Sequence, residues 1–203
     1  MRETFWQTLD GIVGPATRED FEQVGQKETR DAFERFILEN SGPGTRLLDA
    51  GCSTGVEAYR LQQKGYLGSY VGVDSNQKAL HLALRNLHGS PVSFALSDLE
   101  ATSFPDTGFD IVLTKDVIEH APSYRAIVRE MARLTGTWLI LSMFIRMGDE
   151  TSSVREGPPG LFHNRYQRSE FVAFASTLGL EPPSTLYESG DDEVLVFKKR
   201  HTQ

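Results

Sequence analysis

The chain has 203 residues, of which 39% are hydrophobic and 24% charged, a composition typical of a globular protein with one core. A net charge of -7 disfavours nucleic acid as a partner, because duplex affinity depends on Lys and Arg. One cysteine excludes an internal disulfide and a multi-cysteine zinc site. With neither a signal-peptide pattern nor a membrane-length apolar run, we expect a cytoplasmic monomer or homodimer that acts on a small molecule.

The N-terminal region, residues 1–43, is predicted to form a helical cap on a single domain that spans residues 1–203. Residues 18–39 have a helical pattern, with Phe21, Phe33, Phe36 and Ile37 on the apolar side. A Ser-Gly-Pro-Gly sequence at 41–44 ends this helix. We expect the cap to cover a ligand crevice.

The middle of the chain alternates short apolar strands with amphipathic helices. The predicted strands are residues 46–50, 70–74, 92–96, 110–114 and 137–144, and the predicted helices are residues 57–65, 77–87 and 124–134. This alternation is typical of βαβ units in a parallel sheet, with helices on its faces. We therefore predict an α/β fold.

The C-terminal part departs from this alternation. Residues 145–167 form a long connection with Gly-Pro-Pro-Gly at 157–160, which predicts a lid or acceptor loop. Ser169 is the expected N-cap of a last helix that ends at Gly179. Residues 185–188 and 193–199 then flank a turn and predict an antiparallel hairpin at the sheet edge.

A glycine-rich turn follows the first predicted strand. Asp49, Gly51, Ser53 and Gly55 follow the pattern D-x-G-x-[GS]-x-G, which lets the backbone approach a nucleotide-like ligand. Two more acids, Asp74 and Asp98, stand at the ends of the second and third strands. Three acids at successive strand ends suit a cationic ligand with a ribose.

NAD is an alternative ligand, because an acid about 20 residues beyond a glycine turn is also typical of dinucleotide sites. The spacing argues against a nicotinamide-dependent oxidoreductase. Gly51, Ser53 and Val56 occupy the three positions where G-x-G-x-x-G requires glycine.

Over residues 44–200, the turn, the acids and the hairpin resemble class I S-adenosylmethionine-dependent methyltransferases. The resemblance implies a Rossmann-like, doubly wound sheet of seven mostly parallel strands with a C-terminal antiparallel hairpin. It also implies transfer of a methyl group from S-adenosylmethionine to an oxygen or nitrogen of a small acceptor. By this resemblance the methionine moiety lies on Asp49, Gly51, Cys52 and Ser53, the ribose on Asp74, and the adenine on Asp98 and Leu99, with Gly55, Ser75 and Lys115 as further cofactor-binding residues.

A possible metal site follows the fourth strand. Asp116, Glu119 and His120 at i, i+3 and i+4 would share one face of a helical turn. With His163 as a fourth ligand, they could bind Mg2+ or another divalent metal. The segment resembles the E-x-x-E-H pattern of metal-dependent members, including small-RNA 2'-O-methyltransferases and ubiquinone O-methyltransferases, with Asp116 replacing the first glutamate. Metal-free members also carry D-V-[IL]-E-H here.

The expected catalytic residues are His120, His163 and Tyr166. Either histidine could serve as a general base, and the aromatic and basic side chains of residues 161–168 could close over an acceptor. Two rival functions stay open. One is a metal-dependent enzyme like the RNA 2'-O-methyltransferases, and the other is a non-catalytic scaffold that binds S-adenosylmethionine.

Overall fold

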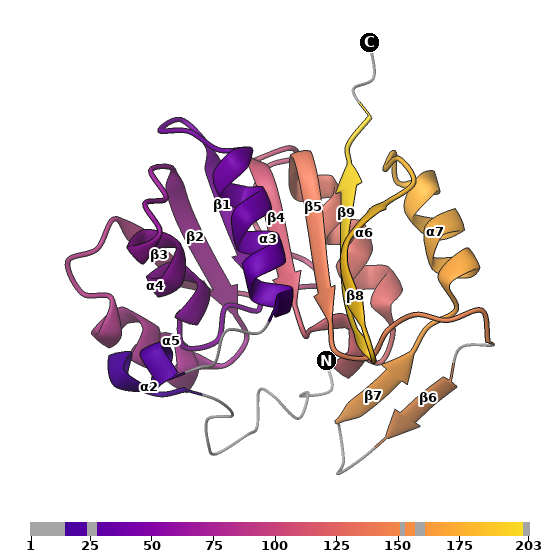
Figure 1. Cartoon of the computed structure of the whole chain (residues 1–203), viewed down its shortest axis with the longest axis horizontal. Coiled ribbons are helices and arrows are strands. Elements are labelled where there is room, and N and C mark those ends of the chain that lie inside the picture. Colours follow the sequence, from indigo (N-terminus) through magenta and orange to yellow (C-terminus); the bar gives the residue numbers. More distant parts are fainter. Residues whose placement is uncertain (1–14, 24–27, 151–152, 157–160, 201–203) are drawn as a thin grey trace.

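A seven-stranded sheet with helices on both faces forms the centre of the computed structural model, which describes residues 15–23, 28–150, 153–156 and 161–200 (Figure 1). The strand order is β3-β2-β1-β4-β5-β9-β8. The first five strands are parallel, β9 runs antiparallel to β5, and β8 runs antiparallel to β9. The strands are β1 (Arg46–Ala50), β2 (Ser69–Asp74), β3 (Val92–Leu96), β4 (Phe109–Lys115), β5 (Thr135–Met143), β8 (Ser184–Ser189) and β9 (Asp192–Lys198). The predicted fold class is confirmed.

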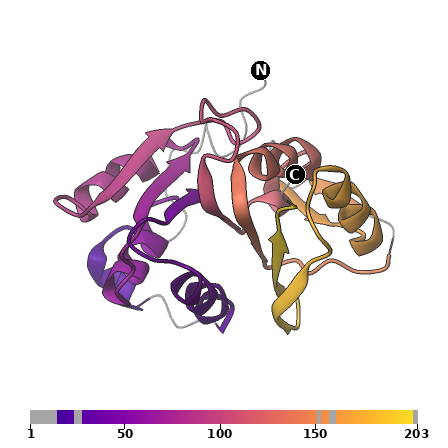
Figure 2. The ribbon, with the colours of Figure 1, turned by 90° about the horizontal axis from the view of Figure 1, so that it is seen from above.

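Two apolar clusters, one on each side of the sheet, hold the helices. The helices are α2 (Arg18–Gln23), α3 (Glu28–Glu39), α4 (Val56–Gln63), α5 (Gln77–Asn86), the 3-10 helix η1 (Ile118–His120), α6 (Tyr124–Leu134) and α7 (Arg168–Thr177). Phe33 of α3 and Leu61 of α4 pack on Leu47, whereas helices α6 and α7 pack with the next strand residue, Leu48. Because neighbouring strand residues point to opposite faces, α3 and α6 lie on opposite sides of the sheet (Figure 2).

The N-terminal region differs from its prediction as one helix over residues 18–39. The structure has two helices, α2 and α3, and residues 24–27 between them lie outside the described ranges. Helix α3 packs its apolar side on the sheet through Phe33 and Ile37. Its polar side is joined to α4 by the buried Glu34 carboxylate, which pairs with Arg60 and Lys64. The prediction that residues 1–43 cap the ligand crevice stays a prediction.

The predicted lid loop contains a second, two-stranded antiparallel sheet of β6 (Ser153–Glu156) and β7 (Phe162–Arg165). We call β7 with the following Tyr166 the lid strand. The Gly-Pro-Pro-Gly segment at 157–160 lies outside the described residues. Helix α7 begins at Arg168, so the expected N-cap at Ser169 is wrong. The Arg168 N–H donates to the Gly148 carbonyl at 2.7 Å, so contact with a distant backbone segment defines the helix start.

The strand order reverses direction between β1 and β4. From β1 the chain continues outward through β2 and β3, and it then returns to place β4 on the other side of β1. In open α/β sheets, ligands bind outside the carboxyl ends of strands at such a switch point. None of the helices in the described ranges has the length and apolarity needed to cross a membrane.

Gly51 allows close packing at this switch point. Its φ is +90°, and a Cβ built on it would lie 2.4 Å from Val117 Cγ2 and 3.8 Å from Leu99 Cδ1. The segments that follow β1, β3 and β4 therefore converge on one glycine. A side chain at position 51 would displace Val117.

We predict that Gly51→Ala lowers the free energy of unfolding more than Gly65→Ala. Gly65 has a similar φ of +85° with no atom within 4 Å of its virtual Cβ, so alanine there costs only the left-handed backbone, roughly 1–2 kcal/mol. At Gly51, displacement of Val117 adds roughly 1–3 kcal/mol. Urea unfolding measures both variants, and equal losses would contradict the close packing of Val117 on Gly51.

Candidate functional site

The turn after β1 is attached to the end of β2 by three backbone N–H groups. Gly51 and Cys52 donate to the Val73 carbonyl at 2.8 and 3.0 Å, and Ser53 donates to Asp74 Oδ2 at 2.8 Å. Ser53 has a left-handed φ of +48°, which directs its N–H out of the usual strand path. The turn is therefore held in a strained conformation by the neighbouring strand.

Asp74 is the acceptor that organises this edge. Its Oδ1 accepts from the Asn76 N–H at 2.8 Å, and Asn76 in turn caps α5 through its own side chain. Burial raises the pKa of Asp74, while hydrogen bonds from the backbone of Asn76, Ser53 and Ser75 lower it in part. The carboxylate is therefore preorganised, and its remaining lone pairs can accept from a ligand.

Asp49 lies in β1 below the turn and is only 1% exposed. The Tyr70 hydroxyl donates to its Oδ2. Burial, together with the nearby carboxylates of Glu57 and Asp74, raises the pKa of Asp49 to about 7 against the lowering by the Tyr70 hydrogen bond. A cationic group bound at the turn would favour the ionised form of Asp49.

The other predicted cofactor residues lie around this turn. The Ser97 N–H donates to the Asp74 carbonyl at 3.0 Å, which places the end of β3 beside the end of β2. Asp98 is exposed there, and its Oδ1 accepts from the Glu100 N–H. Leu99 approaches Gly51. The predicted contacts of these side chains with a cofactor stay predictions.

Cys52 is a packing residue. It is 5% exposed, and its Sγ would lie 2.8 Å from a Cβ built on Gly72. Burial raises the pKa of the Cys52 thiol well above its usual range. The thiol is therefore protonated at neutral pH and is no nucleophile.

An N-terminal segment reaches the same turn from outside the sheet. The Thr54 hydroxyl donates to the Pro15 carbonyl at 2.7 Å. The Asn86 side chain at the end of α5 donates to the Ala16 carbonyl at 2.8 Å. The backbone at 15–16 thus bridges the turn after β1 and the end of α5.

The structure does not gather the four predicted metal ligands into one cluster, although His120 and His163 lie side by side. Among the residues described, which include all four proposed ligands, no group of three or more His, Cys, Asp or Glu could hold a metal ion. Asp116 precedes η1 with a φ of +54° and pairs with Lys115 instead of sharing a helical face with Glu119. Glu119 is fully buried and accepts from the Phe144 N–H at 2.9 Å.

Glu119 is suited to a protonated, structural role. Burial raises its pKa to about 8, so the carboxyl group is mostly neutral at pH 7. In this arrangement the Glu119 carboxyl group is closed off from solvent and contacts the Phe144 backbone. The i, i+3 and i+4 spacing of Asp116, Glu119 and His120 favours one helical face. In the structure Glu119 is instead buried against the segment that follows β5.

His120 has a defined tautomer. Its Nδ1 lies 2.9 Å from the Phe162 carbonyl oxygen, which can only accept, so Nδ1 carries the proton and Nε2 holds the lone pair. Burial lowers the pKa of His120, and His163 lowers it further. The imidazole is therefore neutral at pH 7, with Nε2 as its basic nitrogen.

His163 and Phe144 lie beside this imidazole. The His120 ring centroid is 5.2 Å from that of Phe144 and 5.2 Å from that of His163. His163 is exposed on the lid strand, whereas Phe144 follows β5. Three rings from three segments thus stand together at the carboxyl ends of β4 and β5.

Tyr166, a predicted catalytic residue, is 4% exposed. Its hydroxyl donates to the Ile118 carbonyl at 2.7 Å and accepts from Asn164 Nδ2 at 2.8 Å. Burial raises the pKa of this hydroxyl above its usual range. These contacts suit an anchor of the lid strand better than a proton donor.

Sequence reasoning missed Asn164, Val117 and Tyr70. Phe162, Asn164 and Tyr166 follow a period of two, which is the signal of a strand, but the Gly and Pro residues before them favoured an irregular loop. Val117 and Tyr70 contact the turn and Asp49 only through tertiary packing. No local pattern marks them.

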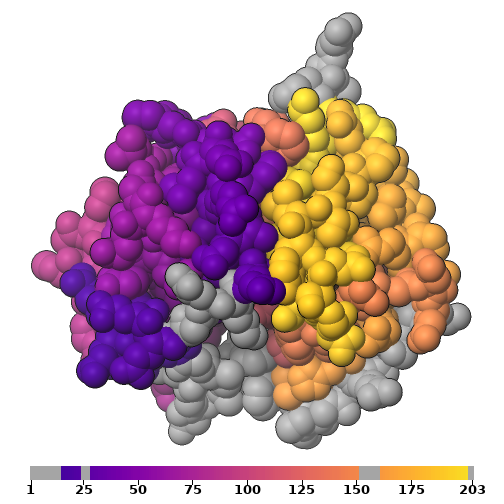
Figure 3. Space-filling view, in the orientation of Figure 1, coloured from indigo at the N-terminus to yellow at the C-terminus, as the bar shows by residue number. Residues whose placement is uncertain are grey.

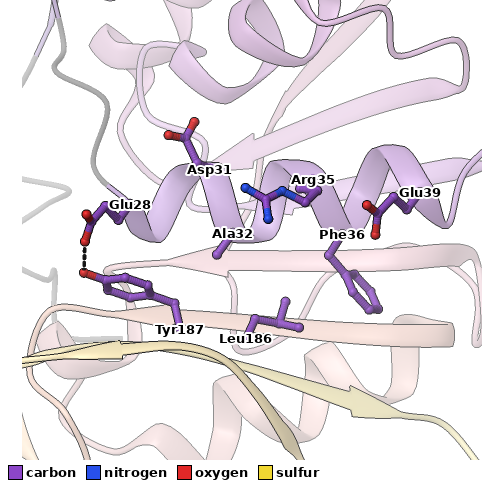
Figure 4. A pocket seen from close by; sticks show the side chains of 8 residues that line it. All are labelled: Glu28, Asp31, Ala32, Arg35, Phe36, Glu39, Leu186 and Tyr187. Atoms are coloured by element: carbon purple, nitrogen blue, oxygen red, sulfur yellow. Dashed lines mark hydrogen bonds between the residues drawn. The ribbon is translucent and has the colours of Figure 1, made fainter.

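A groove of about 360 Å³ lies elsewhere, between α3 and β8 (Figure 4). It is found where the N-terminal and C-terminal surfaces meet in Figure 3. Three of the eight lining residues are acidic, and Tyr187 donates to Glu28 across one end. The lining residues are Glu28, Asp31, Ala32, Arg35, Phe36, Glu39, Leu186 and Tyr187, and none of the predicted site residues is among them.

Comparison with known proteins gives one consistent result. Residues 48–137 match the family model described as a methyltransferase domain. The chain is 30% identical to the ubiquinone biosynthesis O-methyltransferase of Bordetella avium over 71% of this chain and 66% of that protein. It is 28% identical to phosphoethanolamine N-methyltransferase 1 of Arabidopsis thaliana over 52% of this chain and 21% of that protein. The chain thus spans less than two thirds of these relatives.

Solved structures agree on the fold. Magnesium protoporphyrin IX methyltransferase from Synechocystis PCC 6803, solved with bound S-adenosylmethionine, superposes with a TM-score of 0.66 at 18% identity. The match covers 96% of this chain and 89% of that one. The methyltransferase-domain match over residues 48–137, the strand order and the glycine turn at the switch point all agree with the resemblance to the class I S-adenosylmethionine-dependent methyltransferases.

Proposed function

We propose that this protein transfers a methyl group from S-adenosylmethionine to an oxygen or nitrogen of a small-molecule acceptor. The observation that carries the proposal is the convergence at the switch point. There the Ser53 N–H donates a hydrogen bond to Asp74, and the side chains of Leu99 and Val117 lie next to Gly51. Relatives that methylate oxygen and relatives that methylate nitrogen are both among the matches, so the proposal includes both acceptor atoms.

The residues at this edge fit the cofactor. The backbone at 51–55 would hold the methionine moiety at the start of α4, where no side chain caps the helix. The buried Asp49 would stabilise its ammonium group, and Asp74 would accept from the ribose hydroxyls. The exposed Asp98, with Leu99, would contact the adenine. When bound, S-adenosylmethionine supplies a methyl group on a positively charged sulfur.

His120 is the proposed general base for a hydroxyl acceptor. Its neutral imidazole can take the hydroxyl proton at Nε2 while the new oxygen–carbon bond forms and the carbon–sulfur bond breaks. The electron pair of the broken bond stays on sulfur, which becomes neutral. His163 and Phe144 offer ring surfaces beside this base, and we assign them to acceptor binding.

The alternatives have less support. A metal-dependent RNA 2'-O-methyltransferase needs the ligand set that the burial of Glu119 prevents. A net charge of -7 also disfavours an RNA substrate. A non-catalytic scaffold would not need the neutral His120 with a fixed tautomer beside the cofactor edge.

Labelled methyl transfer tests the proposed reaction. The protein is incubated with methyl-labelled S-adenosylmethionine and either pooled metabolites or short RNAs, with magnesium or with a chelator. We expect label in the metabolite fraction at the same rate under both conditions. Label in RNA that is lost with chelator would instead support the metal-dependent enzyme, and binding without any transfer would support the scaffold.

Two substitutions separate cofactor binding from turnover. Asp74→Ala should weaken the binding of S-adenosylhomocysteine by about 10- to 100-fold, because hydrogen bonds to a charged group contribute roughly 1.5–3 kcal/mol. His163→Ala should lower turnover and leave this affinity within about twofold. Asp110→Ala, at the opposite end of β4, is the control. Calorimetry measures the affinity for S-adenosylhomocysteine, and the transfer assay measures turnover. An equal loss of affinity in Asp74→Ala and His163→Ala would contradict the separation of cofactor binding from turnover.

A further inference from the structure

The lid strand is attached to the segment at 118–121 through every second residue. The Phe162 carbonyl accepts from His120 Nδ1 at 2.9 Å. Asn164 Nδ2 donates to the Ala121 carbonyl at 2.6 Å, and the Tyr166 hydroxyl donates to the Ile118 carbonyl at 2.7 Å. The side chains of Asn164 and Tyr166, two residues apart, point to one side of the strand, so this face of the lid strand meets the segment that carries the proposed base.

Asn164 lies at the centre of this contact and is fully buried. Its Nδ2 donates to both the Ala121 carbonyl and the Tyr166 hydroxyl. Its Oδ1 is buried, with no hydrogen-bond partner among the described parts of the chain. A buried polar atom without a partner costs free energy, so an apolar residue would be the cheaper choice for packing alone.

Two ion pairs also attach the lid. Arg165 pairs with Asp191 in the β8–β9 turn at 3.0 Å, and 39% and 70% of the two side chains are exposed. Exposed ion pairs of this kind contribute little to stability. Arg168, which follows the lid strand at the start of α7, pairs with the buried Glu193. Asn164 is therefore the buried attachment between the two contacts made by Phe162 and Tyr166.

We infer that Asn164 is a positioning residue for the acceptor half of the site, an inference that rests on the proposed function. By fixing the lid strand on Ala121, Asn164 keeps the Phe162 carbonyl on His120 Nδ1. A neutral imidazole free in water prefers its proton on Nε2, and in that tautomer Nε2 cannot accept a proton. Asn164 thus holds the proposed base in the tautomer that can react.

Nitrogen-15 NMR of histidine-labelled protein at neutral pH tests this directly, with His120 assigned from a His120→Gln spectrum. In the wild-type protein, His120 should carry its proton on Nδ1. In Asn164→Ala, a substantial fraction should move to Nε2, and turnover should fall at least about tenfold while S-adenosylhomocysteine affinity stays within about twofold. Arg165→Ala, on the neighbouring lid residue, should keep the wild-type tautomer.

Asn164→Leu is the second variant, because it fills the buried site with an apolar side chain and removes the donors to the Ala121 carbonyl and the Tyr166 hydroxyl. It should shift the tautomer in the same direction, and it replaces Asn164→Ala if that variant does not fold. An unchanged Nδ1–H tautomer in a folded Asn164→Ala, or in Asn164→Leu when the first variant is unfolded, would overturn the inference. The tautomer is read without cofactor, so failure of the wild-type protein to bind S-adenosylhomocysteine would count against the proposed function alone.

Discussion

The hydrogen bond from the Ser53 N–H to the Asp74 carboxylate joins the turn after β1 to the end of β2. It accompanies the left-handed conformation of Ser53. Asp74 also organises the start of α5 through Asn76, and its carbonyl accepts from Ser97 at the end of β3. One residue therefore aligns three strand ends, and the proposed cofactor seat depends on that alignment.

Burial gives the carboxyl groups of the site different tasks. Asp74 is held by several backbone N–H groups and remains available as an acceptor. Asp49, below the turn, has a pKa raised to about 7 by burial, so its charge responds to a cation above it. Glu119 has a pKa raised to about 8 by burial and supports the Phe144 backbone as a neutral acid. Similar side chains thus differ in function because their surroundings differ.

Local patterns predicted most of the fold. The short apolar runs, the glycine stops and the turn at 189–192 depend on neighbouring residues, and the strands and the closing hairpin follow them closely. Tertiary contacts decided the rest. Helix α7 starts at Arg168, whose N–H donates to the Gly148 carbonyl, and not after the expected N-cap at Ser169. Glu119, which the spacing predicted as a metal ligand, is fully buried. The role of Asn164 depends on Ala121, 43 positions away, so no window of sequence could reveal it.

Calorimetric titration with S-adenosylhomocysteine and, separately, with NAD tests the central claim most directly, because the same glycine turn and acid at Asp74 are compatible with either ligand class. The account predicts saturable binding of S-adenosylhomocysteine at one site per chain and no binding of NAD. Binding of NAD alone would contradict it.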